Sequence, residues 1–272
     1  MQLAGAAWSW VGATIEESVA IYRALGVQAI DLIAVPGSRL DTYQIAADPQ
    51  REAERFSNLG VALSNLFVFF GADFRDRAIN SPDSAVRANN LTTFRRLLEF
   101  CTAAGMYSIT VLPGVEQQPH SRGQALAWAA SVLKDMNRMA RDAGVLLVYE
   151  PHVNSILQSP QDAQDFIGQC GEVKLVIDYS HGVSLGYSQS DLDVLIPFAG
   201  HVHLRQAAPD KLQARWAEGV IDFPALIDRL KHTGYRGYLT IEYEHDKFWN
   251  MDQCDVVTET IKMRNAVLPS LA

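Results

Sequence analysis

The chain has 272 residues, of which 48% are hydrophobic and 20% are charged, with a formal net charge of −8. This acidic balance disfavours nucleic acid as a partner, because binding to a polyanion normally requires a basic stripe that releases counterions. No segment approaches the about 20 apolar residues of a membrane span, and MQLAGAAWSW at the start lacks the basic and long apolar regions of a signal peptide. We therefore expect a cytoplasmic protein, with three cysteines in the reduced state and no CxxC motif.

One unit recurs along the chain: a segment with helical periodicity, a glycine, and a short β-rich run. Glycine is favoured just beyond a helix C-terminus because it adopts the left-handed conformation without strain. The runs are almost continuously apolar, which is typical of parallel strands covered on both faces. Eight strands are expected in this pattern, at residues 3–8, 27–35, 61–70, 106–113, 145–150, 172–178, 201–205 and 235–242.

The segments between the expected strands are amphipathic and predict helices, for example at residues 15–25, 91–104 and 125–143. Two further helix starts are marked by a capping residue followed by proline, at Ser159-Pro160 and at Asp222-Phe223-Pro224. Alternation of eight strands with helices, without a Ser/Gly/Pro-rich linker, predicts a single-domain (β/α)₈ TIM barrel over residues 1–272. An open doubly wound sheet lacks support, since no GxGxxG follows the first strand.

Two segments have a predicted place relative to the barrel. Residues 71–90 are long and polar and read as an extended loop between a strand and a helix. On the active face of a barrel such loops often act as lids. Residues 253–271 are expected to form a helix that closes the barrel.

Four consecutive later strands each carry a possible metal ligand at the C-terminal end: Glu150, Asp178, His203 and Glu242. The C-termini of parallel barrel strands converge on one mouth, so these distant residues can share one ion. A single one of them would be read as a solvated strand end, but the coincidence on four strands favours a metal site. Three carboxylates and one imidazole favour Mn²⁺, Mg²⁺ or a similar ion over a structural zinc site, with Co²⁺ and Zn²⁺ as alternatives.

Two of these strands offer a second residue of the same type. His201 and His203 lie on the same side of their strand, so periodicity does not choose between them. We take His203 as the ligand because it is nearer the mouth, and expect His201 to be buried lower in the barrel. Glu242 fits the end of its apolar run, so Glu244 is expected outside the ligand set.

Neighbouring residues suggest proton chemistry and substrate contact. Glu150 and Glu242 come from strands three barrel positions apart, so they could flank a ligand, remove a proton from one face of a carbon and return one to the other. His181, three residues after Asp178, could bind a substrate hydroxyl or hold a water molecule, or could simply cap the next helix.

For the other residues predicted near the mouth, a role in substrate binding stands beside an ordinary role at the surface or in the core. Arg205 and Arg215 could hold a carboxylate, a phosphate or a ketone oxygen, or could be solvated surface residues. Trp8 and Trp216 could wall the pocket against the apolar side of a sugar, although barrel aromatics are more often core. His120, in the loop after the fourth strand, is expected to be exposed.

The pattern of Glu after the fifth strand, DxxH after the sixth, His-x-His-Leu in the seventh and Glu on the eighth resembles the xylose isomerase-like superfamily of TIM barrels. This group includes sugar epimerases, sugar-phosphate isomerases, inosose dehydratases, 3-dehydroshikimate dehydratases and family-2 AP endonucleases. The similarity runs from LGVQAIDL to GYLTIEYE and is more specific in the second half.

The resemblance implies that Glu150, Asp178, His203 and Glu242 bind one divalent ion, usually Mn²⁺. It implies that the ion stabilises the enediolate formed when a hydroxy-ketone is deprotonated, while the two glutamates exchange the proton. It further implies a small carbohydrate or polyol-like substrate and a possible homo-oligomer, since relatives often form dimers or tetramers.

Two departures from this pattern bear on function. Asp31 stands on the second strand where family members often carry Glu. The segment EPHVNSIL resembles the ExHxNxL segment of the 3-dehydroshikimate dehydratase branch, in which the histidine that matches His152 can serve as the base. His152 could thus be a general base for β-elimination or a residue that supports Glu150, and Asn154 could contact a substrate oxygen or be an ordinary turn residue.

The leading hypothesis is a metal-dependent sugar isomerase or epimerase, and the alternative is a lyase that uses His152 as base. Both reactions begin with removal of a proton next to a carbonyl, so the metal ligands alone do not separate them. An AP endonuclease is disfavoured by the net charge and by the lack of Asp-x-His after His203. A barrel that only binds a ligand is the remaining hypothesis.

Overall fold

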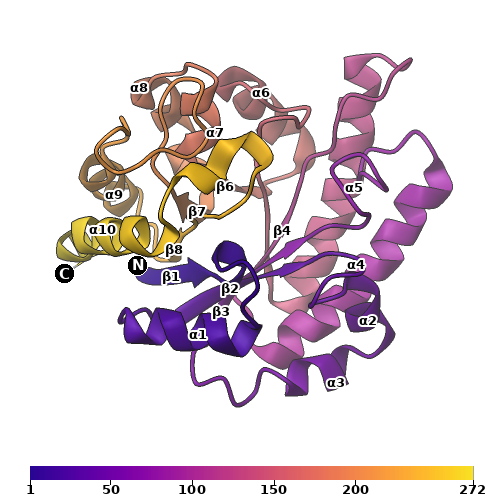
Figure 1. Cartoon of the computed structure of the whole chain (residues 1–272). Coiled ribbons are helices and arrows are strands. Elements are labelled where there is room, and N and C mark those ends of the chain that lie inside the picture. The colour runs from indigo at the N-terminus through magenta and orange to yellow at the C-terminus, as the bar shows by residue number, and fades with distance from the viewer. Residues whose placement is uncertain (272) are drawn as a thin grey trace.

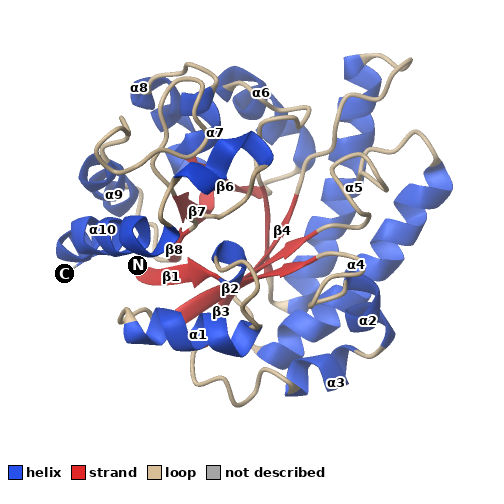
Figure 2. Ribbon diagram, viewed as in Figure 1, coloured by secondary structure: helices blue, strands red, loops and turns tan. Residues whose placement is uncertain are grey.

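Eight parallel strands close into a barrel in sequence order, and β1 completes it by pairing with both β2 and β8 (Figure 1). The computed structural model describes residues 1–271. Figure 2 shows the strands gathered inside a surrounding layer of helices, so the predicted (β/α)₈ barrel is confirmed. The strands are β1 (Gln2–Ala6), β2 (Ala29–Ala34), β3 (Ala62–Val68), β4 (Ser108–Val111), β5 (Leu146–Tyr149), β6 (Lys174–Asp178), β7 (Ala199–Leu204) and β8 (Tyr238–Ile241).

Helices follow the strands around the outside of the barrel. The α-helices are α1 (Ile15–Ala24), α2 (Thr42–Ala47), α3 (Pro49–Glu54), α4 (Ser84–Ala104), α5 (Arg122–Ala143), α6 (Pro160–Cys170), α7 (Tyr179–Ser184), α8 (Gln189–Leu192), α9 (Phe223–His232) and α10 (Val256–Val267). Short 3₁₀ segments are η1 (Ala7–Ser9), η2 (Asp193–Phe198), η3 (Phe248–Gln253) and η4 (Leu268–Leu271). None of the helices within residues 1–271 is both long and apolar enough to cross a bilayer.

Helix boundaries follow the capping residues in the sequence. The Ser159 side chain accepts a hydrogen bond from the backbone N–H of the third residue of α6, and Asp222 does the same for α9. Both satisfy an N–H that has no partner within its helix, so the two predicted starts are confirmed. Gly105 ends α4 with φ of 69°, in the left-handed region that favours glycine.

The loop after β3 is shorter than predicted. Residues 84–90, expected in the loop, form the first turns of α4, because Asp83 caps the helix by accepting a hydrogen bond from the N–H of Ala85. The remaining loop still lies between a strand C-terminus and the following helix, on the face of the barrel where βα loops form active sites. The expected closing helix is present as α10.

The barrel interior is polar below the mouth, unlike the apolar layer between strands and helices. Asp31 of β2, Asn65 of β3 and His201 of β7 are completely buried. Ser108 and Thr110 of β4 donate hydrogen bonds to Asn65 Oδ1 at 3.0 and 2.9 Å. Buried polar groups are stable only when they are hydrogen-bonded, so this network ties the strands together directly beneath the candidate site.

Candidate active site

The ends of β5 to β8 bring the four predicted metal ligands together. Glu150, Asp178, His203 and Glu242 are all at least nine-tenths buried. His203 Nδ1 lies 3.1 Å from Glu150 Oε1 and 3.3 Å from Glu242 Oε2. One ligand atom each from Glu150, Asp178 and His203 lies within 4.8 Å of the others. This clustering follows from parallel strands of similar length, whose last residues meet at one mouth.

The chemistry of this cluster fits a divalent cation. Its donors are carboxylate oxygens and one imidazole nitrogen. Carboxylate oxygens suit Mg²⁺ and Mn²⁺, and an imidazole nitrogen also suits Zn²⁺. Glu242 Oε2 is buried, yet among residues 1–271 no donor makes a hydrogen bond to it. A buried carboxylate oxygen without such a partner is unfavourable, and coordination to a cation would satisfy it.

Arg205 places a buried guanidinium against the same carboxylates. Its Nη2 lies 3.0 Å from Asp178 Oδ2 and 3.5 Å from Glu242 Oε2, and its Nη1 lies 3.1 Å from Glu244 Oε1. Ser180 Oγ accepts two further hydrogen bonds from it, at 3.2 and 3.1 Å. Arg205 therefore lies at the mouth, where its charge is already matched by three carboxylates, and its contact with a substrate stays a prediction.

The two glutamates that flank His203 have opposite electrostatic environments. Burial raises the pKa of Glu150 to about 7, although the nearby imidazole opposes the shift. Burial also acts to raise the pKa of Glu242, but His203 and Arg205 outweigh it and lower that pKa to about 2. Burial would lower the pKa of His203, yet Glu242, Asp31 and Glu150 raise it well above its usual value. One carboxylate therefore titrates near neutrality while the other stays ionised, as in pairs that divide acid and base roles.

Asp31 lies below His203 and contacts both histidines of β7. Its Oδ2 is 2.7 Å from His201 Nε2 and 3.4 Å from His203 Nε2. Its Oδ1 accepts a short hydrogen bond from Ser64 Oγ. His201 is completely buried, as predicted. Sequence reasoning did not find the contact with His203, although a carboxylate inside the apolar run AIDLIA signals a buried charge that needs a partner.

His152 and His181 form a stacked pair beside the ligand cluster. Their ring centroids are 3.8 Å apart, and His181 Nε2 lies 3.4 Å from Asp178 Oδ2. Burial lowers the pKa of His152 to about 4, so the ring is neutral at pH 7. Its Nδ1 lies 2.5 Å from the carbonyl oxygen of the next residue. A carbonyl only accepts, so Nδ1 carries the hydrogen and Nε2 keeps a lone pair that can take a proton.

A row of aromatic rings lines another part of the mouth. The rings follow one another in the order Trp8, Phe67, Phe69, Phe74 and His152, with successive centroids 6.3, 5.5, 5.6 and 4.9 Å apart. The Trp8 ring also meets that of His203 edge-on at 6.3 Å. Four of the five rings come from the ends of β1 and β3 and from the β3–α4 loop. Sequence reasoning named only the first and last members. We call this set the aromatic wall: Trp8, Phe67, Phe69, Phe74 and His152.

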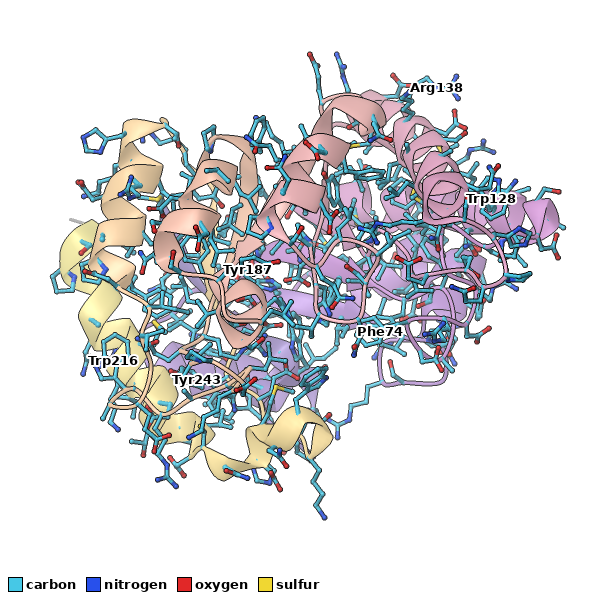
Figure 3. The ribbon with its side chains drawn as sticks, turned by 90° about the horizontal axis from the view of Figure 1, so that it is seen from above. Phe74, Trp128, Arg138, Tyr187, Trp216 and Tyr243 are labelled. Carbon is cyan, nitrogen blue, oxygen red and sulfur yellow. The ribbon has the colours of Figure 1, made fainter. Side chains whose placement is uncertain are left out.

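Two residues predicted for the mouth are not brought there. The Arg215 side chain is 60% exposed and donates to the carbonyl of Gln253 at 3.3 Å. Trp216 stacks against Phe223 at the start of α9, with ring centroids 6.1 Å apart. Figure 3 shows Trp216 and Phe74 on different sides of the molecule. The long β7–α9 connection folds back over the helices, so nearness to His203 in sequence does not place these residues near it in space.

Asn154 and His120 are the two other loop residues considered in the sequence, and the structure places both at the surface. Asn154 is exposed and has φ of 67°, a left-handed conformation that asparagine tolerates in turns. These features suit the turn residue considered for it more than a contact deep in the mouth. His120 is exposed, as expected, and its ring meets that of Trp128 edge-on at 5.0 Å.

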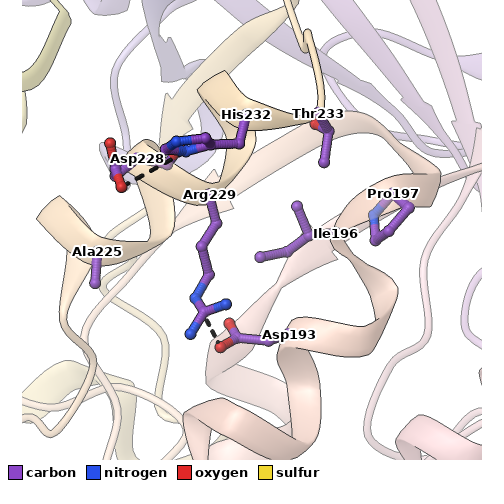
Figure 4. Close-up of a pocket in the computed structure, with 8 residues that line it drawn as sticks. All are labelled: Asp193, Ile196, Pro197, Ala225, Asp228, Arg229, His232 and Thr233. Atoms are coloured by element: carbon purple, nitrogen blue, oxygen red, sulfur yellow. Dashed lines mark hydrogen bonds and ion pairs between the residues drawn. The ribbon is translucent and has the colours of Figure 1, made fainter.

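A surface pocket of about 540 Å³ lies outside the barrel, between η2 and α9 (Figure 4). Its charged groups pair with each other: Arg229 Nε lies 2.9 Å from Asp193 Oδ2, and His232 Nδ1 lies 3.6 Å from Asp228 Oδ2. The His232 and Asp228 side chains are 76% and 69% exposed, so solvent screens them. None of the predicted site residues lines this pocket, which makes the barrel mouth the stronger candidate.

A family model described as xylose isomerase-like TIM barrel matches residues 19–265 of the chain. The chain belongs to this family. Among curated members, the rhizopine catabolism protein MocC of Rhizobium meliloti is 26% identical over 152 residues, covering 48% of this chain and 47% of MocC. The inosose dehydratase of Clostridium perfringens is 28% identical over 141 residues, covering 43% of this chain and 46% of the dehydratase. The matches thus span about half the length of these relatives.

Solved structures of xylose isomerase-like barrels superpose over nearly the whole chain. An IOLI protein with a bound zinc atom has a TM-score of 0.75 at 16% identity, covering 100% of this chain and 98% of that one. An L-ribulose 3-epimerase has a TM-score of 0.74 at 20% identity, covering 100% of this chain and 95% of that one. Similarity at this level of identity establishes the shared fold.

Proposed function

We propose that this chain is a divalent-metal-dependent isomerase or epimerase of a small keto-sugar or related keto-polyol. The observation that carries the proposal is the convergence of Glu150, Asp178 and Glu242 around His203 at the barrel mouth. The names of the L-ribulose 3-epimerase among the structural neighbours and of the inosose dehydratase among the relatives support a substrate of this class.

Glu150, Asp178, His203 and Glu242 would hold the ion, and Mn²⁺ suits their oxygen-rich set best, with Mg²⁺, Co²⁺ and Zn²⁺ as alternatives. The ion supplies Lewis-acid polarisation of a substrate carbonyl. Glu150 and Glu242 both lie within 3.3 Å of His203 Nδ1, on strands separated by β6 and β7. This arrangement lets one glutamate remove a proton next to the carbonyl while the other returns one.

The remaining groups support binding of an uncharged substrate. Trp8, Phe69, Phe74 and His152 of the aromatic wall are partly exposed, and their rings would offer apolar area to the C–H face of a sugar and exclude water from the reacting carbon. His181 lies beside Asp178 and can donate to or accept from a substrate hydroxyl. Arg205 is held by three carboxylates, so it offers little free charge to a phosphate.

The test is deuterium exchange in D₂O with the Mn²⁺-loaded protein and a panel of keto-sugars, followed by NMR. We expect deuterium at the carbon next to the carbonyl with all substrate oxygens retained. Glu150→Gln and Glu242→Gln should each slow exchange by about 100-fold or more, whereas Glu54→Gln, an exposed glutamate on α3, should leave it unchanged. Exchange that persists at full rate in both mouth variants would show that these glutamates do not move the proton.

A lyase is the second candidate, because His152 is neutral and its Nε2 lone pair is free to act as a base. Elimination of water next to a ketone would produce an enone, which absorbs in the near ultraviolet. Appearance of this absorbance, and its loss in His152→Gln, would replace isomerisation by elimination. Deuterium exchange without an enone, unaffected by His152→Gln, would exclude this candidate.

A further inference from the structure

We infer that Asp31 is a positioning residue that fixes the tautomer of His203, so that Nδ1 faces the metal site and Nε2 carries the hydrogen. The inference rests on the proposed function, since it concerns the same metal ligand. It assigns a role to a strand β2 residue that lies across the barrel from the ligand strands.

The two nitrogens of His203 face different groups. Nδ1 lies 3.1 Å from Glu150 Oε1 and 3.3 Å from Glu242 Oε2, on the side where the ligand atoms gather. Nε2 lies 3.4 Å from Asp31 Oδ2, on the side of the barrel interior. A neutral imidazole has one N–H and one lone pair. A carboxylate below Nε2 favours the hydrogen there, which leaves the Nδ1 lone pair for an ion.

Asp31 is itself held rigidly, which a positioning residue requires. Its Oδ2 is 2.7 Å from His201 Nε2, and its Oδ1 accepts a hydrogen bond from Ser64 Oγ. These two contacts come from β3 and β7, so the carboxylate cannot turn away from His203 without breaking hydrogen bonds to both strands.

The same three residues, Asp31, His201 and His203, could in principle hold a second ion, because their ligand atoms lie within 4.8 Å of one another. The 2.7 Å separation between Asp31 Oδ2 and His201 Nε2 is a hydrogen-bond length. Two ligands of one ion lie farther apart than this, since each needs about 2 Å to the metal in a tetrahedral or octahedral arrangement. The distance therefore favours hydrogen bonding over a second metal site.

The test measures Zn²⁺ and Mn²⁺ binding by calorimetry in the wild type and in Asp31→Asn, after removal of metal with a chelator. Asparagine keeps an oxygen acceptor but loses the charge, and we expect affinity to fall about 10- to 100-fold, as for other carboxylates behind a histidine ligand. Thr240→Val is the matched control, because it removes a hydroxyl from the same polar layer whose hydrogen bond goes to His201 Nε2 and leaves the carboxylate of Asp31 in place. It should leave affinity within about twofold.

A second measurement needs no variant. Long-range ¹H–¹⁵N spectra of the Zn²⁺-loaded wild type should show His203 Nε2 as the protonated nitrogen and Nδ1 as the metal-bound one. The opposite tautomer, equal affinity of Asp31→Asn and wild type, or an equal loss in Thr240→Val would each overturn the inference. So would two ions per chain in the wild type with one lost in Asp31→Asn, since Asp31 would then be a ligand.

The outcome also separates this inference from the proposed function. If Glu150→Gln abolishes metal binding while Asp31→Asn binds normally, the metal site stands and only the role of Asp31 falls. If Glu150→Gln binds metal as tightly as the wild type, the ligand assignment itself is wrong.

Discussion

Replacing Arg205 with methionine removes a buried cation while keeping an unbranched side chain that can fill much of the same space. In the structure its guanidinium lies 3.0 Å from Asp178, 3.5 Å from Glu242 and 3.1 Å from Glu244. The variant leaves these carboxylates with His203 as the neighbouring cationic group. Removing one partner of a buried ion pair is costly, because the remaining charge is left uncompensated in a poorly solvated place.

The expected loss of stability in Arg205→Met follows from that uncompensated charge. Breaking a buried pair typically costs about 3–5 kcal/mol, and for a chain of this size each kcal/mol lowers Tm by roughly 2 °C. The metal-free Arg205→Met protein should therefore melt about 6–10 °C below the wild type at pH 7.5. Circular dichroism in the presence of a chelator measures this difference directly. Added Mn²⁺ should narrow the gap, since a divalent ion supplies positive charge to Asp178 and Glu242.

The loss of stability in Arg205→Met should also depend on pH in a definite direction. Burial raises the pKa of Asp178 and raises that of Glu244 to about 7, and Arg205 opposes both shifts. Without Arg205 these groups take up protons more readily, so the deficit in stability should be largest at high pH and shrink toward pH 5. Arg215→Met is the control, because that exposed side chain should contribute within about 0.5 kcal/mol. Equal losses in the two variants, or a deficit that grows as pH falls, would refute the reasoning.

Other expected outcomes test the site and the fold. Metal affinity should rise by about tenfold per pH unit for each proton released, because Glu150, with its pKa raised by burial to about 7, and His203, with its pKa raised well above the usual value by neighbouring carboxylates, must both lose a proton to bind an ion; an affinity that is flat from pH 5.5 to 7 would contradict this. Gly5→Ala should lower Tm by about 2–6 °C, because a Cβ there would lie 2.2 Å from the buried Tyr22 ring, whereas Gly123→Ala, which meets nothing within 4 Å, should not. Ser159→Ala should cost about 1 kcal/mol in denaturant unfolding by removing the cap of α6, and a change below 0.3 kcal/mol would count against the cap.

The barrel and the convergence of four strand-end residues could be predicted because both depend on local pattern. Each strand is a short apolar run after a glycine, and parallel order then fixes where its last residue lies. Glu150, Asp178, His203 and Glu242 occupy such positions, so knowing the strand ends was sufficient to bring them together.

Contacts across the barrel and within long loops could not be predicted in the same way. Asp31 and His203 belong to strands that are not neighbours, and their contact depends on the length of each side chain in the barrel interior. Arg215 and Trp216 lie in a connection whose path is set by packing against α9, α10 and η3, which no local pattern reports. The Phe67–Phe74 part of the aromatic wall had a visible signal in FVFFGADF, but core packing explains such a run equally well.

The aromatic wall has a consequence for how this barrel could be re-engineered. Trp8, Phe67, Phe69 and Phe74 all precede β4, whereas the four candidate ligands lie between β5 and β8. Four of the five rings of the aromatic wall and all four candidate ligands are therefore encoded in different halves of one polypeptide, with His152 on the side of the ligands. A chimera that joins residues 1–105 of a relative to residues 106–272 of this chain would replace these four rings, and Asp31 with them, while it keeps the four candidate ligands. Recombination at the turn before β4 would thus vary most of the aromatic wall without changing Glu150, Asp178, His203 or Glu242, and a relative with Asp at the position of Asp31 would keep the contact to His203 as well.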